Sequence, residues 1–217
     1  MRTPDTAVVD VDGTLVDTNY HHALAWYRAF RRFDQTLPVW RLHRAIGMGG
    51  DQLVTAVAGA RFEDEYGDDV RKAWSAEFEP MLREVRPLGG VRELLAELRG
   101  RGLAVVLASS GAPEHVETYL DLFDGRELAD AWTTSEDVER TKPGPDLIAV
   151  AVERVGGRSA VVIGDSVWDF EAAPRAGHPG YAIRTGGFST EELRAAGACG
   201  VFDALPDLHQ ALDEILR

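Results

Sequence analysis

The sequence predicts an α/β protein with a Rossmann-like, doubly wound parallel sheet and an inserted all-helical cap. Three observations support this prediction. Short apolar runs alternate with stretches of helical periodicity, one long segment contains helical patterns only, and polar side chains follow the ends of the apolar runs. Strands that alternate with crossover helices form a parallel sheet that is covered on both faces.

The strands of this sheet are expected at four short apolar or β-branched runs, each bounded by Gly, Asp or Arg: residues 6–11, 103–108, 160–163 and 181–184. Helical spacing of apolar residues is clearest in 91–98 and is repeated less regularly in 145–155 and 205–216. The chain therefore reads as repeated strand-and-helix units.

Residues 18–87 break this alternation, because they contain no convincing strand. Helical candidates occupy 19–33, 38–46, 51–58 and 65–85, with a glycine-rich stretch at 47–50 between them. Without this segment of roughly 70 residues, about 147 residues remain, which is an ordinary domain size. We therefore expect a Rossmann-like core made of residues 1–17 and 88–217, and a helical cap made of residues 18–87.

The charge balance of the chain argues against some classes of binding partner. The 217 residues include 36 Asp and Glu against 23 Lys and Arg, which gives a formal charge of −13. Such acidity argues against nucleic acid and against anionic membrane surfaces as partners. A single cysteine excludes an internal disulfide and fits a reducing compartment, and the short apolar run at 7–9 is too short for a signal or membrane segment. We expect a cytoplasmic monomer or small homo-oligomer.

Polar residues follow the predicted strand ends, where ligands bind in open parallel sheets. The residues concerned are Asp10, Asp12, Gly13, Ser109, Ser110, Gly111, Lys142, Asp165 and Asp169. Asp10 and Asp12 are two residues apart, so an extended chain would point both carboxylates the same way. Adjacent carboxylates repel unless a cation intervenes, and with an oxygen of Asp165 they would suit a hard cation such as Mg²⁺.

These residue types also suit phosphoryl chemistry. One carboxylate near a metal can attack phosphorus, and a neighbouring carboxylate can donate and recover a proton. Lys142 and the Ser109 hydroxyl would hold the phosphoryl oxygens, and Gly13 and Gly111 would let backbone N–H groups approach them. Each motif alone is also typical of an ordinary turn or helix start. Their occurrence in order at matching strand ends is what indicates a site.

Four segments, 10–17, 107–110, 142–143 and 164–169, resemble the four motifs of the haloacid dehalogenase-like hydrolase superfamily. The resemblance extends through 169–177 and includes a helical cap after the first motif, as in the phosphoglycolate phosphatase and β-phosphoglucomutase branches. It implies a Rossmann-like core, a requirement for Mg²⁺ and hydrolysis of small phosphate monoesters.

The resemblance also implies roles for individual residues. Asp10 would be the nucleophile, and Asp12 the general acid and base with its backbone carbonyl on the metal. Asp165 would complete the metal ligands, with Asp169 as an acid beside them. Ser109 and Lys142 would bind the phosphoryl group, together with the neighbouring groups Gly13, Ser110 and Gly111.

Related activities differ at specific positions. Haloacid dehalogenases lack the second aspartate, so Asp12 favours phosphoryl chemistry. Phosphonate hydrolases use a cap lysine, but Lys72 reads as part of a solvated helix face. His22 falls where β-phosphoglucomutases carry a hinge histidine, whereas their cap arginine would fall near Gly50. Hydrolysis is therefore favoured, with a sugar phosphomutase and a non-catalytic phospho-ligand sensor as alternatives.

The cap is expected to contribute contacts to the leaving group. The candidates are His22, beside the first motif, and Arg44 and Met48, near the glycine-rich loop. The aromatic residues Trp26, Tyr27, Phe30 and Phe33 have helical spacing and are expected to form the core of the cap. The sequence thus predicts a Mg²⁺-dependent phosphatase that acts on a small phosphorylated metabolite, of the phosphoglycolate or sugar phosphate type.

Overall fold

A fully parallel sheet of six strands lies at the centre of the computed structural model, which describes residues 3–217. The strand order is β3-β2-β1-β4-β5-β6. The strands are β1 (Thr6–Val9), β2 (Ala104–Ala108), β3 (Ala131–Thr133), β4 (Ala160–Gly164), β5 (Gly180–Ile183) and β6 (Gly200–Phe202). Val9 pairs with Leu107 of β2 and with Ile163 of β4, so these three strands end at one edge of the sheet.

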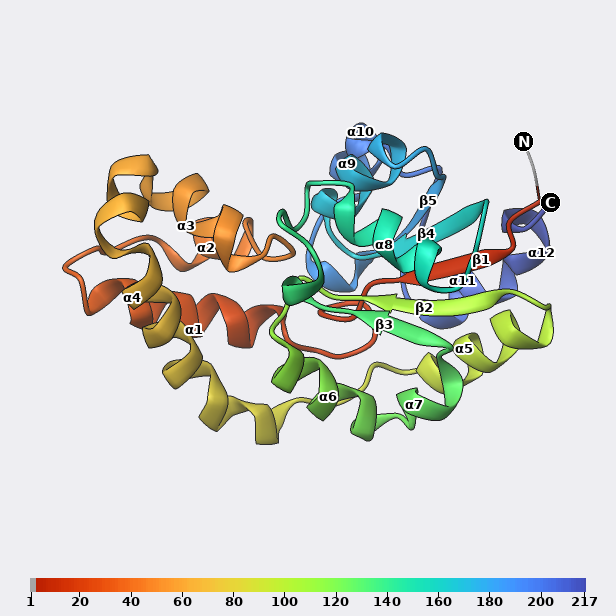
Figure 1. Cartoon of the computed structure of the whole chain (residues 1–217), viewed down its shortest axis with the longest axis horizontal. Helices are drawn as coiled ribbons and strands as arrows, with labels where there is room; N and C mark the ends of the chain where they lie inside the picture. Colours follow the sequence, from red (N-terminus) through yellow and green to blue (C-terminus); the bar gives the residue numbers. More distant parts are fainter. Residues whose placement is uncertain (1–2) are drawn as a thin grey trace.

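Helices cover both faces of the sheet (Figure 1). One face carries α5 (Val91–Gly100), α6 (Pro113–Leu122), α7 (Gly125–Leu128), α11 (Leu205–Gln210) and α12 (Leu212–Ile215). The other carries α8 (Asp146–Arg154), α9 (Val167–Arg175) and α10 (Thr190–Ala196). Along β1, Ala7 and Val9 pack with the first group and Val8 with the second, as expected when side chains alternate along a strand. This confirms the doubly wound α/β fold.

The predicted strands all occur, although their ends differ by up to two residues. The sequence missed β3 and β6, which are three residues each and lie at the two edges of the sheet. Their side chains are mostly only partly buried, so they form no apolar run. The predicted helix at 205–216 is interrupted at Ala211, which separates α11 from α12.

Between β1 and α5 the chain forms helices and no strand, apart from isolated bridges such as Val16 with Pro87. The helices are α1 (Asn19–Arg31), α2 (Val39–His43), α3 (Gly50–Ala58), α4 (Ala60–Phe78) and the 3₁₀ helix η1 (Glu79–Glu84). We refer to residues 19–84 as the helical region, which extends to the left in Figure 1. The long helix begins at Ala60 rather than at residue 65, because Gly59 adopts a φ of 89° that ends α3 and starts α4.

The helical region has an apolar cluster of its own. Trp26 and Phe30 of α1 pack there with Leu53 of α3 and Val70 of α4, as expected for aromatic residues at helical spacing. Phe78, at the end of α4, belongs instead to the apolar cluster of the sheet. The helical region therefore packs around its own side chains and meets the sheet at the end of α4. Its boundaries as a separate cap domain, residues 18–87, stay a prediction.

No helix among residues 3–217 combines the length and the apolar character that crossing a bilayer requires.

Candidate active site

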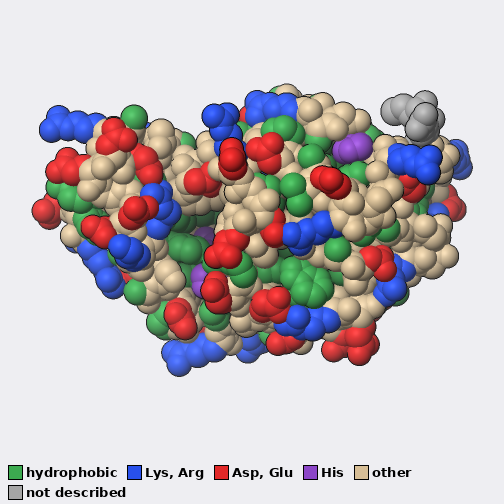
Figure 2. Space-filling model, in the orientation of Figure 1, with side chains coloured by type: hydrophobic (Ala, Val, Ile, Leu, Met, Phe, Trp, Pro, Cys, Tyr) green, Lys and Arg blue, Asp and Glu red, His purple; other side chains and the backbone are tan. Residues whose placement is uncertain are grey.

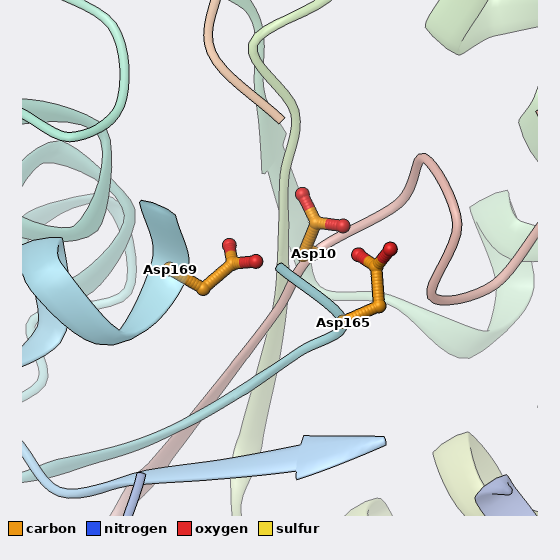
Figure 3. A group of neighbouring side chains, drawn as sticks. All are labelled: Asp10, Asp165 and Asp169. Carbon is orange, nitrogen blue, oxygen red and sulfur yellow. The ribbon is translucent and has the colours of Figure 1, made fainter. Parts of the chain in front are cut away.

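Three buried carboxylates converge at the carboxyl edge of the sheet (Figure 3). Asp10 follows β1, and its backbone N–H donates to the carbonyl of Ile163 at 2.9 Å, which continues the pairing with β4. Asp165 follows β4, and Asp169 lies in the first turn of α9. One oxygen from each carboxylate lies within 4.8 Å of the others. The parallel sheet therefore brings together residues that are more than 150 positions apart in the chain.

Lys142 is the cation of this cluster. Its side chain is 3% exposed, and its ammonium pairs with Asp10, with Asp169 Oδ1 at 2.8 Å and with the carbonyl of Ala108 at 3.2 Å. Burial alone would lower the pKa of this ammonium, but the attraction of Asp10 and Asp169 outweighs burial and raises it. Lys142 is therefore a fixed positive charge beside the carboxylates.

The carboxylates repel one another despite this lysine. Burial, together with the charges of Asp169 and Asp12, raises the pKa of Asp10 to about 7 against the opposing effect of Lys142. Burial and the charges of Asp10 and Asp169 likewise raise the pKa of Asp165 well above its usual value. Buried like charges are costly unless a further cation joins them. The donor set is all oxygen, so it fits a hard divalent ion such as Mg²⁺, with Asp10, Asp165 and Asp169 as the candidate ligands.

Asp12 lies in a different environment. Its carboxylate accepts hydrogen bonds from Thr18 at 3.0 Å and from Ser109 at 2.9 Å, and Oδ1 lies 2.9 Å from His22 Nε2. Burial raises the pKa of Asp12, but these neighbours outweigh it and lower the pKa to about 2. The carboxylates of Asp10 and Asp12 thus have very different proton affinities although they are two residues apart. Such a difference is expected where two carboxyl groups have different roles in acid–base chemistry. That the Asp12 carbonyl binds the metal stays a prediction.

The two serines after β2 have different surroundings. Ser109 Oγ donates to Asp12 and accepts from the backbone N–H of Gly111 at 2.9 Å, so both groups are engaged. Ser110 Oγ is buried and has no hydrogen-bond partner within the described residues. Ser109 and the Gly111 N–H thus bond to each other and Ser109 bonds to Asp12, and their contact with a phosphoryl group stays a prediction. Ser110 offers the free hydroxyl.

The backbone N–H and carbonyl groups of Gly13 both form hydrogen bonds within the protein. Its backbone N–H donates to the Val16 carbonyl at 2.8 Å, and its own carbonyl accepts from Thr185 at 2.6 Å. The residue has a φ of 81°, and a Cβ there would overlap Asn19 and Asp165. That Gly13 lets backbone N–H groups approach a phosphoryl group stays a prediction, and its own N–H is engaged by Val16. Gly13 permits the close packing around Asp165.

A cavity of about 360 Å³ lies above Asp10 and Asp12, between the sheet edge and the helical region. Figure 2 shows a hollow at this place, with hydrophobic and histidine side chains visible in it. The lining residues are Asp10, Asp12, His22, Trp26, Ile46, Gly47, Met48, Gly49, Gly50, Asp51, Arg71, Trp74, Ser110, Gly111, Ala112, Ser135, Val138, Glu139 and Thr141. The cavity is therefore enclosed by the helical region and by loops of the sheet edge.

The structure brings two of the three expected cap residues to this cavity. His22 and Met48 line it, and the His22 ring stacks on Phe78 with centroids 4.1 Å apart. Arg44 does not line it. Its guanidinium lies 3.9 Å from the Phe188 ring centroid and pairs with Glu192, so it joins α2 to α10. Arg44 thus connects the helical region to α10, which covers the sheet. The expectation that Arg44 touches the leaving group is corrected, because its side chain lies outside the cavity lining.

Several residues of the site were not predicted. Thr14 Oγ1 lies 2.9 Å from Asp10 Oδ2 and 3.0 Å from Asp165 Oδ1, and Asn19 Nδ2 donates to Asp165 Oδ2 at 2.7 Å. Asp51, at the start of α3, accepts from the Thr141 hydroxyl beside Lys142. Thr14 belongs to the first motif and could have been found there. Asn19 and Asp51 carry no such local signal, because each acts on a distant part of the chain.

The contact of Asn19 leads to a first prediction. Replacing Asn19 with Ala removes the donor that orients Asp165, and the loss of an outer partner of a metal ligand typically weakens metal affinity by about tenfold or more. We expect Asn19→Ala to raise the Mg²⁺ concentration for half-maximal activity by about tenfold, while saturating Mg²⁺ restores most of the turnover. A Mg²⁺ titration measures this, and an unchanged half-maximal concentration would contradict it.

The chain is similar in sequence to a family of hydrolases and to named phosphatases. Residues 4–177 match the sequence profile described as haloacid dehalogenase-like hydrolase. The chain is 29% identical to the phosphoglycolate phosphatase of Caulobacter vibrioides, over 97% of this chain and 92% of that protein. It is 26% identical to the probable phosphatase IndB of Dickeya dadantii, over 97% of this chain and 94% of that protein.

A solved structure is similar over nearly the same span. The crystal structure of a hydrolase from Pseudomonas syringae superposes with a TM-score of 0.91 and 31% sequence identity. The match covers 98% of this chain and all of that chain. The helical region is therefore included in the similarity, as well as the sheet.

Proposed function

The chain belongs to the haloacid dehalogenase-like hydrolase family and is a phosphatase, and from this premise we propose that it hydrolyses small phosphate monoesters with Mg²⁺ through an aspartyl-phosphate. One observation carries the proposal. The Asp10 carboxylate lies at the floor of the cavity, within the three-carboxylate cluster and against Lys142. The names of the relatives favour a substrate of the phosphoglycolate or sugar phosphate type.

The proposed reaction begins at Asp10. Its carboxylate oxygen attacks phosphorus, the bond between phosphorus and the ester oxygen breaks, and the phosphoryl group is transferred to Asp10. Lys142 and Ser110 would hold the phosphoryl oxygens, since the first is a fixed cation and the second a free hydroxyl. Mg²⁺, held by Asp10, Asp165 and Asp169, would neutralise the negative charge that nucleophile and phosphoryl group bring together.

Asp12 would move the proton in both halves of the reaction. Its low pKa means that it is ionised before substrate arrives, and the charge of an entering phosphoryl group raises the proton affinity of a neighbouring carboxylate. Asp12 would then take up a proton from solvent and give it to the oxygen of the leaving alcohol. As a carboxylate again, it would take a proton from water that attacks the aspartyl-phosphate, which releases phosphate and restores Asp10. His22, Ser109 and Thr18 position this side chain.

The helical region is proposed to act as a cap over the reacting groups. The contacts that bridge it to the part of the chain that carries the sheet include His22 to Asp12, Asp51 to Thr141 and Arg44 to Glu192. Of these, the Asp51–Thr141 contact lies at the cavity wall and would open for a substrate to enter, and closure would exclude water from the reaction. The predicted boundaries, 18–87 for the cap and 1–17 with 88–217 for the core, fit this role.

The direct test of this proposal is phosphate release from p-nitrophenyl phosphate by the purified protein. We expect turnover with millimolar Mg²⁺, loss of turnover in EDTA and recovery when excess Mg²⁺ is restored. Phosphate release that persists unchanged in EDTA would contradict the metal requirement. No phosphate release from this ester or from a panel of phosphorylated metabolites would contradict the proposed hydrolysis.

A phosphomutase remains the alternative enzyme. It would need a cation for a second phosphate, and Arg71 of α4 lies against Gly50, where the mutase arginine is otherwise expected. Arg71 is already held by Glu63 and Asp68, however, so hydrolysis remains the better supported reaction. Incubation with a hexose 1-phosphate and a hexose bisphosphate separates the two, because a mutase forms isomerised sugar without free phosphate. Binding of phosphate esters without any turnover would instead favour the non-catalytic sensor.

A further inference from the structure

The part of the cavity that would hold the leaving group is poor in available positive charge. Among the cavity-lining residues within 3–217, Arg71 of α4 is the only lysine or arginine. Lys142 lies beneath the floor of the cavity, where its ammonium is paired with Asp10 and Asp169. Among the described lining residues, an anionic group on the leaving alcohol would therefore have Arg71 as the one lysine or arginine to pair with.

Arg71 is already neutralised by acids of its own helix. Glu63 contacts both ends of its guanidinium, at 3.1 Å from Nη1 and 2.8 Å from Nη2, and Asp68 contacts Nη2 at 2.8 Å. Nη1 also donates to the Gly50 carbonyl at 3.2 Å. Such a paired guanidinium, with both terminal nitrogens engaged, has little left to offer an entering anion. Its contacts instead fix α4 against the start of α3.

Two further carboxylates face the same space. Asp51 and Glu139 both line the cavity, and Asp51 is held in place by the hydroxyl and the backbone N–H of Thr141. Glu63 and Asp68 pair with Arg71 without lining the cavity, so beyond Asp10 and Asp12 the wall offers the carboxylates of Asp51 and Glu139 and one guanidinium that is already paired. A leaving group that carried a carboxylate would meet like charges there, whereas an amine would meet opposite ones.

The rest of the wall is apolar and broad. Trp26 and Trp74 line it with ring centroids 5.2 Å apart, and Ile46 and Met48 close the side formed by the helical region. Trp74 Nε1 is buried and has no hydrogen-bond partner among the described residues, so it is a spare donor beside this wall. Aromatic walls with a few polar groups suit the faces of rings that also carry hydroxyls. The cavity is also far larger than a two-carbon leaving group needs.

We infer that the preferred substrate is the phosphate ester of a ring-sized polyol that is uncharged or bears an amine, and that esters with a carboxylate on the leaving group are discriminated against. This inference rests on the proposed phosphatase function and deepens it. It separates the two substrate types named above, since it favours sugar phosphates or amino-sugar phosphates over phosphoglycolate.

The test compares esters that differ in one group. Glucose 1-phosphate, glucosamine 1-phosphate and glucuronate 1-phosphate share the ring and the transferred group but differ in the charge of the leaving alcohol. A smaller pair is 2-hydroxyethyl phosphate and phosphoglycolate. With Mg²⁺ present, we expect kcat/KM to be lower for each carboxylate ester than for its uncharged counterpart by at least about tenfold. The amine ester should equal or exceed the uncharged one.

A pair of variants tests whether the pairing of Arg71 with acidic residues causes the discrimination against carboxylate esters. Asp68 is 87% exposed and contacts Arg71, whereas the adjacent Asp69 is 64% exposed and contacts Lys72 instead. Asp68→Asn should free part of the Arg71 guanidinium and raise the ratio of kcat/KM for glucuronate 1-phosphate over glucose 1-phosphate by about threefold or more. Asp69→Asn makes the same chemical change away from Arg71 and should leave this ratio unchanged.

The outcomes separate this inference from the proposed function. Hydrolysis of p-nitrophenyl phosphate together with equal or better turnover of the carboxylate esters would overturn the inference and leave the phosphatase standing. A carboxylate preference that disappears in Arg71→Met would overturn it most clearly, because it would show that Arg71 binds the anion. No phosphate release from any ester would overturn the proposed function and this inference with it.

Discussion

Asp10→Asn is expected to reduce kcat by about 10³-fold or more, because an amide cannot act as the nucleophile that the carboxylate provides. The substitution preserves the shape of the side chain, and its oxygen can still accept from the Thr14 hydroxyl. The fold should therefore survive. Removing one of three mutually repelling carboxylates should also keep or raise the melting temperature in EDTA, since the crowding that raises the pKa of Asp10 is relieved.

The matched control is Asp17→Asn. Asp17 follows in the same segment but is exposed, so the same change there should leave both kcat and the melting temperature close to those of the parent protein. Steady-state kinetics and thermal unfolding measure the two effects together. Parent-like turnover by Asp10→Asn would exclude the aspartyl-phosphate. A loss of turnover accompanied by a lower melting temperature would indicate damage to the fold instead.

Lys142→Met is expected to impair both catalysis and stability. The cluster would lose its one resident cation, and removing one partner of a buried charge group typically costs about 3–5 kcal/mol because the other charges stay uncompensated. We expect unfolding at a clearly lower temperature in EDTA, with partial recovery in Mg²⁺. The phosphoryl group would also lose its fixed cation, so kcat/KM should fall by about 10²- to 10³-fold even at saturating Mg²⁺.

Lys72→Met is the control for this variant. The sequence contains two lysines, and Lys72 is the exposed one, with its side chain 78% exposed and a surface pair to Asp69. The same substitution there should change the free energy of unfolding by less than about 1 kcal/mol. Equal effects of the two variants, or an unchanged kcat/KM in Lys142→Met, would contradict the place we give Lys142 in the site.

The sheet and the carboxylate cluster could be predicted because local signals determine them. Apolar runs mark β1, β2 and β4, and polar residues directly after the runs must lie at one edge once the strands pair in parallel. β3 and β6 gave no such signal, since partly buried edge strands need no continuous apolar run. The α4 helix began earlier than predicted because its start depends on the conformation of Gly59.

The details of the site were less predictable, because they depend on which neighbour satisfies each polar group. Ser109 and Ser110 look alike in the sequence, but only the structure shows that Ser109 bonds to Asp12 and that Ser110 stays free. Arg71 and Lys72 look like one solvated helix face. The two point to different surroundings, and Arg71 reaches the cavity while Lys72 does not. Contacts between residues 8 positions apart, as for Arg71 and Glu63, or 97 positions apart, as for Ser109 and Asp12, decide these environments. The periodicity of apolar residues contains no information about them.

The burial of Lys142 has a practical consequence for chemical labelling. Acylating reagents react with neutral, accessible amines, and Lys142 is 3% exposed with its proton held firmly by Asp10 and Asp169. Of the two lysine side chains, reagents of this kind should therefore modify Lys72 alone. Lys72 is on the long helix of the region that faces the sheet edge. A fluorophore placed there would report on movement of that helix without altering any of the groups proposed to react with phosphate.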